Sequence, residues 1–253
     1  MYLSRVEVNP RRRDTMRAMS SPEIMHASVM SAFPAFDMDS GRILWRLDTL
    51  GESTYVLIQS QTKPDLTHMV EQFGWPASGQ RWETVDYEGF LEGIAAGDVR
   101  RFRLVANPVR SVPSGQHGER GKVCHHITSE QQLSWLTSKA LRLGVTFDRE
   151  SDPRCYAEVV SRELQRFGHK GSEITLSRVG FQGILRVEDP DMLRASMVNG
   201  IGRAKAYGCG MLSLSRVLDA RYPNRPQEQA GTAPHKGPDI VPLPGALHGW
   251  QER

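Results

Sequence analysis

Hydrophobic and polar residues alternate along several stretches of this chain with the two-residue period of a β-strand. In Tyr2–Val8, for example, Val6 and Val8 share one face while Arg5 and Glu7 share the other. The same kind of pattern predicts further strands over Ile43–Leu47, Tyr55–Ser60, Arg100–Val109, Cys155–Phe167, Glu173–Val187 and Met211–Val217.

Other segments carry helical signals. Ser21, Pro22 and Glu23 provide a capping side chain, a proline suited to the first turn and an acid at the positive end of the helix dipole. We expect that helix to run to about Ala32, because Pro34 disfavours a helical conformation in the residue before it. Further helices are predicted over Ser129–Leu143 and Pro190–Val198.

The order of these elements predicts the fold class. The first half reads strand, helix, strand, strand, and the second half continues helix, strand, strand, helix, strand, which is typical of ferredoxin-like units. We therefore expect an α+β protein with two tandem ferredoxin-like domains, at residues 1–97 and 98–218.

Glycines at Gly168 and Gly171 predict that the two long strands form a β-hairpin. The segment Gly74–Gly97 stays unassigned, Val112–Lys122 is expected to be a polar loop, and the proline-rich tail at 219–253 is expected to be disordered.

Composition narrows the possibilities without indicating a function. The chain has 32 Lys and Arg against 29 Asp and Glu, so any nucleic-acid site must come from local clustering of cations. The 3 cysteines form no C-x-x-C pair, which argues against a zinc ribbon. His125 and His126 would point to opposite faces of an extended segment, a poor arrangement for a metal. No segment resembles a signal peptide or a membrane-spanning helix of roughly 20 apolar residues. We expect a cytoplasmic protein with no membrane partner, no metal and no cofactor.

The segment Gly200–Gly210 concentrates glycines and two cations, Arg203 and Lys205, ahead of a predicted strand. Glycine permits the positive φ of tight turns, and consecutive backbone N–H groups in such turns form a concave anion site to which the cations add charge. This chemistry suits a phosphate group. The alternative is a tight turn between helix and strand in which the glycines serve only the geometry of the backbone.

Separated segments of the chain also carry a resemblance to a known family. They are Met1-Tyr2-Leu3-Ser4, Met25-His26, Arg101-Phe102-Arg103-Leu104-Val105-Ala106-Asn107-Pro108, Trp135-Leu136, Gly180-Phe181-Gln182-Gly183 and the run Gly200–Leu214 with Lys205. In order and spacing, from residue 1 to about 217, this set resembles the type I-E CRISPR repeat-processing endoribonucleases called CasE. No single motif is decisive, but the ordered set is much more specific than a glycine loop alone.

The resemblance implies two ferredoxin-like domains and binding of the stem-loop of a CRISPR repeat transcript. It implies cleavage at the 3′ base of the stem without a metal ion, and retention of the product within the Cascade surveillance complex, whose other subunits would be partners. RNA can be cut without a metal because its own 2′-OH attacks the adjacent phosphate. The enzyme must then move protons and stabilise the charge that develops on phosphorus.

His26 matches the catalytic histidine of that family, and an imidazole with a pKa of about 6.5 suits proton transfer. It stands about one turn into the first predicted helix, near the dipole end that attracts phosphate. The alternative is an ordinary half-buried histidine. Relatives can carry a tyrosine three residues earlier, where this chain has Glu23, so we do not expect the contribution of that tyrosine here.

Cations should hold the RNA and stabilise the transition state. Lys170, in the predicted hairpin turn, is the candidate for the second role because relatives place a lysine close to this point, although Ser172 is an alternative match. Candidates for contacting RNA are Arg101, Arg103, Arg162, Arg166, Arg178, Arg186, Gly202, Arg203, Lys205 and Gly208. We expect Arg178 and Arg186 to share a polar face of the hairpin, and Arg162 and Arg166 to add charge on that side. Such a face would recognise mainly the shape and phosphates of an RNA duplex. A solvated sheet face is the alternative.

Two other functions stay open. One is a non-catalytic RNA-binding scaffold subunit of a ribonucleoprotein complex, with which Glu23 is consistent. The other is an enzyme that binds a small-molecule nucleotide at Gly200–Gly210. That segment lacks the preceding strand and following helix of a dinucleotide or P-loop site.

Overall fold

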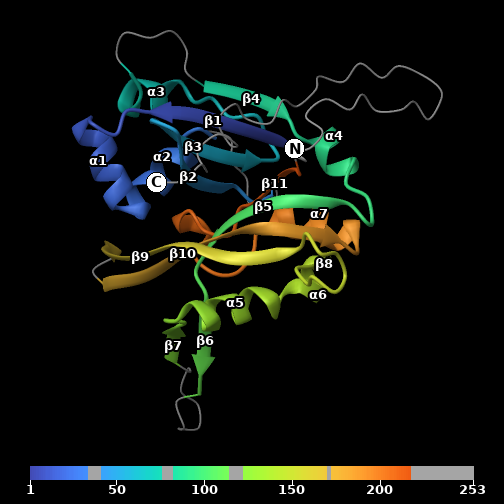
Figure 1. Cartoon of the computed structure of the whole chain (residues 1–253). Helices are drawn as coiled ribbons and strands as arrows, with labels where there is room; N and C mark the ends of the chain where they lie inside the picture. The colour runs from blue at the N-terminus through green and yellow to red at the C-terminus, as the bar shows by residue number, and fades with distance from the viewer. Residues whose placement is uncertain (34–40, 76–81, 114–121, 170–171, 218–253) are drawn as a thin grey trace, which may run out of the picture.

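The structure, a computed structural model, describes residues 1–33, 41–75, 82–113, 122–169 and 172–217. These residues form two large antiparallel β-sheets, one in each half of the chain, with helices packed against each (Figure 1). Our proposed division after residue 97 falls in the connection between the last element of the first half, helix α4 (Glu88–Glu92), and the first strand of the second half, β5 (Val99–Ala106).

The first sheet has the strand order β2-β3-β1-β4. Its strands are β1 (Tyr2–Val8), β2 (Leu44–Leu50), β3 (Ser53–Ser60) and β4 (Trp82–Asp86), and its helices are α1 (Arg13–Ser20), α2 (Pro22–Met30) and α3 (Thr67–Phe73). Val6 and Val8 of β1 are fully buried in one core with Met25 and Val29 of α2. The alternation in β1 therefore turns one face of the sheet toward the helices, as the sequence predicts.

The second sheet has the order β11-β5-β10-β8, with β9 also paired to β10. Besides β5, its elements are α5 (Ser129–Thr137), α6 (Ala140–Leu143), β8 (Val145–Thr146), β9 (Tyr156–His169), β10 (Ser172–Val187), α7 (Pro190–Asn199), the 3-10 turn η2 (Lys205–Tyr207) and β11 (Leu212–Arg216). Apart from β8, the fourth, first, third and second strands of each half lie side by side in that order. The chain thus has the predicted α+β fold with two tandem ferredoxin-like domains.

Several predicted boundaries differ from the structure. The helix expected over Ser129–Leu143 is two helices, α5 and α6, and the strand expected over Arg100–Val109 ends at Ala106. Pro108 has no N–H for the sheet ladder, which explains the second difference. The ends of the loop expected over Val112–Lys122 belong to a separate two-stranded sheet, β6 (Val109–Val112) and β7 (Lys122–His125). Residues 114–121 and the tail 219–253 lie outside the described residues.

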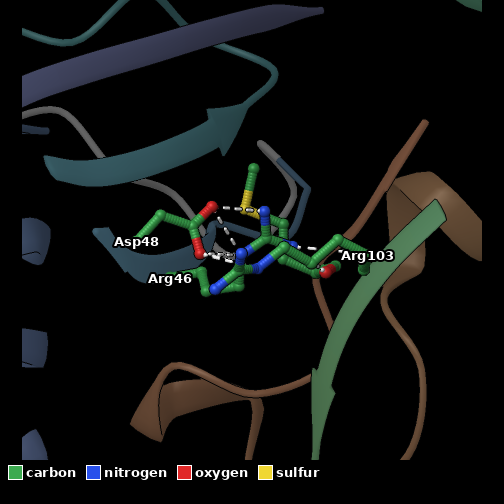
Figure 2. Close-up of polar contacts among 4 residues, drawn as sticks. Arg46, Asp48 and Arg103 are labelled. Carbon is green, nitrogen blue, oxygen red and sulfur yellow. Dashed lines mark hydrogen bonds and ion pairs between the residues drawn. The ribbon is translucent and has the colours of Figure 1, made fainter. Parts of the chain in front are cut away.

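A buried ion pair on β2 joins the two halves (Figure 2). Arg46 Nη2 lies 2.6 Å from Asp48 Oδ2, and both side chains are almost fully buried. Arg46 Nη1 also donates to the main-chain oxygens of Arg103, at 3.2 Å, and Met211, at 3.0 Å, both in the second half. Burial alone would raise the pKa of Asp48, but the charges of Arg46, Arg103 and Arg178 lower it. The Asp48 carboxylate therefore stays ionised at neutral pH.

Candidate active site and RNA interface

His26 lies on α2, and its neighbours on that helix define its direction. Met25 and Val29 are buried in the first core, which fixes the rotation of α2 about its axis. Glu23 stands almost one turn before His26, so the two share a face of the helix. Burial, and after it the charge of Glu23, raise the pKa of Tyr207 in η2. Helix α2 contacts both η2 and β9. Glu23 therefore lies toward the glycine segment, and His26 lies on the helix face that it shares with Glu23.

The environment of the His26 ring favours its neutral form. The residue is half-buried, and burial lowers its pKa below the ordinary value of 6.5. Its Nδ1 atom is buried and has no hydrogen-bond partner among the described residues. At neutral pH the ring is uncharged, so one of its nitrogens can accept a proton. Such an imidazole can act as the general base for a ribose 2′-OH.

The glycine segment, Gly200–Gly210, packs closely against aromatic side chains. Each of its glycines has a positive φ, which glycine adopts without strain. A Cβ atom at Gly208 would lie 2.8 Å from the ring of Trp45, and one at Gly202 would lie 3.1 Å from the ring of Trp135. Packing against indole rings and the turn geometry therefore account for glycine at both of these candidate RNA-binding positions.

The turn η2 brings two cations together. The indole N–H of Trp45 donates to the main-chain oxygen of Ala206 at 3.1 Å and so anchors the turn to β2. Burial, and after it the charge of Arg42, lower the pKa of the half-buried Lys205 ammonium. Within the described part of the chain, neither Lys205 nor the exposed Arg42 forms an ion pair with a carboxylate. Two neighbouring cations without a counterion favour the binding of an anion such as a phosphate.

Arg42 is a further candidate site residue, which sequence reasoning missed. It precedes β2, far from the glycine segment in the sequence, and only the packing of the two halves brings it to Lys205. Arg203 lies apart from this pair. Its Nη2 donates to Ser111 Oγ at 3.3 Å, and its main chain bridges to Asn107, so it is placed beside β6.

The hairpin arginines do not form a single basic face. Residues directly opposite each other on antiparallel strands point to the same face. Arg162 is opposite Val179 and Arg166 is opposite Thr175, whereas Arg178 is opposite Glu163. The prediction that Arg162 and Arg166 add charge on the side of Arg178 is therefore wrong, because it was made without the register of the hairpin. Arg162 and Arg166 are both exposed and remain candidates for contacting RNA.

Arg178 is internal, contrary to the expectation of an open polar face. It is 8% exposed, and its Nη1 lies 3.5 Å from Glu163 Oε2. Burial raises the pKa of Cys209 to about 12, and Arg178 hydrogen-bonds this side chain. Arg178 therefore sits beneath the glycine segment. Arg186, at the other end of β10, donates to the main-chain oxygen of Ser151 at 3.2 Å.

Arg101 and Arg103 lie at alternate positions of β5 and so share a face. Arg103 Nε is 3.2 Å from Asp48 Oδ1, which makes Arg103 part of the network between the sheets (Figure 2). The Nε atom of Arg101 is buried without a hydrogen-bond partner among the described residues. The two side chains thus leave guanidinium groups on the face of β5 that meets the first half.

Lys170, the predicted transition-state cation, lies outside the described residues. Over the described ranges, no cluster of three or more His, Cys, Asp and Glu side chains could hold a metal ion, and no helix there has the length and apolar character needed to cross a bilayer. Cys124, Cys155 and Cys209 are all free.

Comparison with known proteins places these features in a family. Residues 1–216 match the family model described as CRISPR associated protein. The chain is 26% identical over 224 residues to the CRISPR-associated endoribonuclease Cse3 of Thermus thermophilus, covering 85% of this chain and 100% of that protein. It is 28% identical over 170 residues to the CRISPR system Cascade subunit CasE of Escherichia coli, covering 65% of this chain and 75% of the relative.

Solved structures agree with the sequence comparison. Thermus thermophilus Cse3 bound to an RNA representing a pre-cleavage complex superimposes with a TM-score of 0.68 at 25% identity, covering 85% of this chain and 98% of that one. The CRISPR-associated protein Cas6e of Escherichia coli has the same fold, with a TM-score of 0.57 at 24% identity, covering 86% of this chain and 100% of that one. Since the family model spans both ferredoxin-like domains, the protein belongs to the CRISPR associated protein family.

Proposed function

We propose that the protein is a metal-independent endoribonuclease that matures CRISPR RNA. It binds the stem-loop of the repeat, cleaves the precursor at the 3′ base of the stem, and keeps the product as part of Cascade in the cytoplasm. The names of its relatives, an endoribonuclease and a Cascade subunit, support this proposal. The observation that carries it is the contact between α2, the helix that bears the neutral, half-buried imidazole of His26, and η2, the turn that bears Lys205.

The reaction follows from this arrangement. The His26 ring takes the proton from the ribose 2′-OH, and the 2′ oxygen then forms a bond to the adjacent phosphorus. The bond from phosphorus to the 5′ oxygen breaks, and that oxygen takes up a proton, which solvent can supply. The products are a 2′,3′-cyclic phosphate and a 5′-OH. Lys205 and Arg42 hold the RNA backbone nearby, where their charge favours phosphate.

Lys170 remains our candidate for the cation that stabilises the charge developing on phosphorus. This assignment rests on the resemblance to relatives that carry a lysine near this point. Glu23 stands where relatives can have a tyrosine, so the phenol hydroxyl of those relatives is replaced by a carboxyl group here. His26 therefore carries out the proton abstraction without that tyrosine.

The test is cleavage of the protein's own repeat RNA in EDTA. Wild-type protein should cut at one position, and His26→Ala should not, while RNA affinity stays near that of the wild type. His126→Ala, at a half-exposed histidine beside β7, is the matched control and should cut normally. A substrate with 2′-deoxyribose at the cut site should bind without being cleaved. Stem-loop binding with no cleavage by wild-type protein would instead favour the non-catalytic scaffold, and cleavage abolished by EDTA would refute metal independence.

A further inference from the structure

A hollow lies between helix α1 and strand β9. It is open to solvent and has a volume of about 440 Å³, within the range of roughly 300–1,000 Å³ typical of small-ligand sites. Its lining includes Met16, Met19 and Ser20 from α1 and Glu163, Gln165 and Arg166 from β9. Helix α1 ends at Ser20 and α2 begins two residues later, so the end of α1 that lines the hollow leads directly into α2, the helix that carries His26.

The outer face of α1 is basic. Thr15 and Ala18 are its buried residues, so the helical period places Arg13, Met16 and Arg17 on the opposite side. All three are exposed, Met16 to 53%. Among the described residues, neither arginine forms an ion pair with a carboxylate.

The acids close to the hollow do not cancel this charge. Asp14 is the acidic residue of α1, against two exposed arginines on the same helix. Glu163 is already engaged, because Gln165 Nε2 donates to it at 2.7 Å and Arg178 Nη1 lies 3.5 Å from it. Arg166, on the lining itself, adds a further exposed cation. Arg13 and Arg17 do not line the hollow, but they stand one helical turn before the lining residues Met16 and Ser20, so apolar methionine side chains and three cations lie near one another.

An unpaired nucleotide fits this combination. Methionine side chains supply a polarisable apolar surface for a base. Guanidinium groups stack on bases and bind phosphates through several donors at once. The glycine segment and β9 both contact α2, so an RNA strand held at His26 can continue from the cations of η2 toward the hollow.

We infer that the hollow binds an unpaired nucleotide on the 3′ side of the cleavage site, with Arg13 and Arg17 contacting its phosphates. This inference rests on the proposed function, since it needs the scissile bond at His26. It adds a second contact region to the stem-loop site. The protein would thereby distinguish a precursor, which has the 3′ flank, from the processed stem-loop, which has lost it.

The experiment compares RNAs that carry 2′-deoxyribose at the cut site, so that binding is measured without cleavage. One is the bare stem-loop, the second adds unpaired nucleotides on the 3′ side, and the third adds them on the 5′ side. The variant is the double substitution Arg13→Ala, Arg17→Ala. Arg142→Ala, on the exposed surface of α6 in the other half of the chain, is the control.

Wild-type protein should bind the 3′-flanked RNA more tightly than the bare stem-loop. The double variant should lose this gain, by up to ~25-fold in ~0.1 M salt, because two lost single-strand phosphate contacts lower the salt slope by about 1.4. Its affinity for the bare stem-loop should not change. The inference would be overturned if the double variant bound all three RNAs more weakly to the same extent, or if it bound them as tightly as wild type. It would also be overturned if the gain in affinity required the 5′ flank. Failure of wild-type protein to bind the bare stem-loop would instead count against the proposed function.

Discussion

Arg103 of β5 and Asp48 of β2 belong to different sheets, yet their Nε and Oδ1 atoms lie 3.2 Å apart. With Arg46, which reaches main-chain oxygens of the second half, they form a network across the contact between the two domains. The Arg103 side chain is 38% exposed. Arg103 therefore holds the sheets together, and its exposed part is what can contact RNA.

Asp48→Asn should destabilise the protein. The substitution leaves the buried Arg46 without its counterion, and loss of one partner of a buried pair costs about 3–5 kcal/mol. The folded pKa of Asp48 is lowered from 3.8. Its contribution to the free energy of unfolding is therefore present above pH ~4 and lost as pH falls through the folded pKa. Urea unfolding at pH 7 and at several acidic values measures both effects.

The control for this variant is Glu83→Gln. Glu83 pairs with Arg5 at 2.8 Å, but its side chain is largely exposed, so its loss should cost less than about 1 kcal/mol. If Asp48→Asn and Glu83→Gln unfold at the same urea concentration, the buried network does not stabilise the contact between the sheets.

The pH dependence of cleavage should report the lowered pKa of His26. A general base works in its neutral form, so the single-turnover rate should fall as pH drops through the pKa of His26. Because burial lowers that pKa, the midpoint of the acidic limb should lie below 6.5. A midpoint at or above 6.5 would contradict the assigned protonation state, and in His126→Ala the limb should stay in place.

Gly208→Ala should displace the turn η2. Gly208 has φ 75°, and its added Cβ would lie 2.8 Å from the Trp45 ring, so the variant combines backbone strain with a clash. We expect a loss of about 2–3 kcal/mol in the free energy of unfolding and weaker RNA binding. Gly51→Ala separates the two causes, because Gly51 has φ 60° but nothing within 4 Å of the added atom. It should lose only about 1 kcal/mol and bind RNA normally.

Lys205→Ala and Arg42→Ala should each weaken binding of the stem-loop. Each removes one phosphate contact, so the slope of log affinity against log salt should decrease by about 0.7–0.9. Lys63→Ala, at an exposed lysine after β3, is the control. Unchanged slopes for both variants would show that these cations do not meet the RNA backbone.

Local patterns predicted most strands of the two large sheets, but they missed β4, β8 and several helices. The alternation in β1 and the start signals before α2 are local patterns, and the structure confirms both elements. Ser21 is at the N-cap position of α2, but its side chain makes no capping hydrogen bond, contrary to the expectation. Helix α1 was missed because its buried residues, Thr15 and Ala18, are small and weakly apolar. The run of arginines that leads into α1, Arg11 to Arg13, was a usable signal for a basic surface.

The site depended on long-range contacts that a single sequence does not specify. Strand periodicity placed Arg178 on a polar face, but the glycine segment covers that part of the sheet, and a register shift between Gly180 and Phe181 changes the pairing of the hairpin. The meeting of Arg42 with Lys205 has the same origin, since it needs the two halves to pack together. Residue type alone cannot distinguish an arginine that binds a partner from one that supports the fold.

The hydrogen bond from Trp45 to Ala206 has a consequence for the energetics of association. A loop that becomes ordered only in a complex loses conformational freedom at that moment, at about 0.5–1.5 kcal/mol for each immobilised side chain. Here the backbone around Lys205 is already held in place in the free protein by the hydrogen bond from the Trp45 indole. The entropic cost of arranging this anion site is met during folding, so more of the electrostatic attraction remains as net affinity.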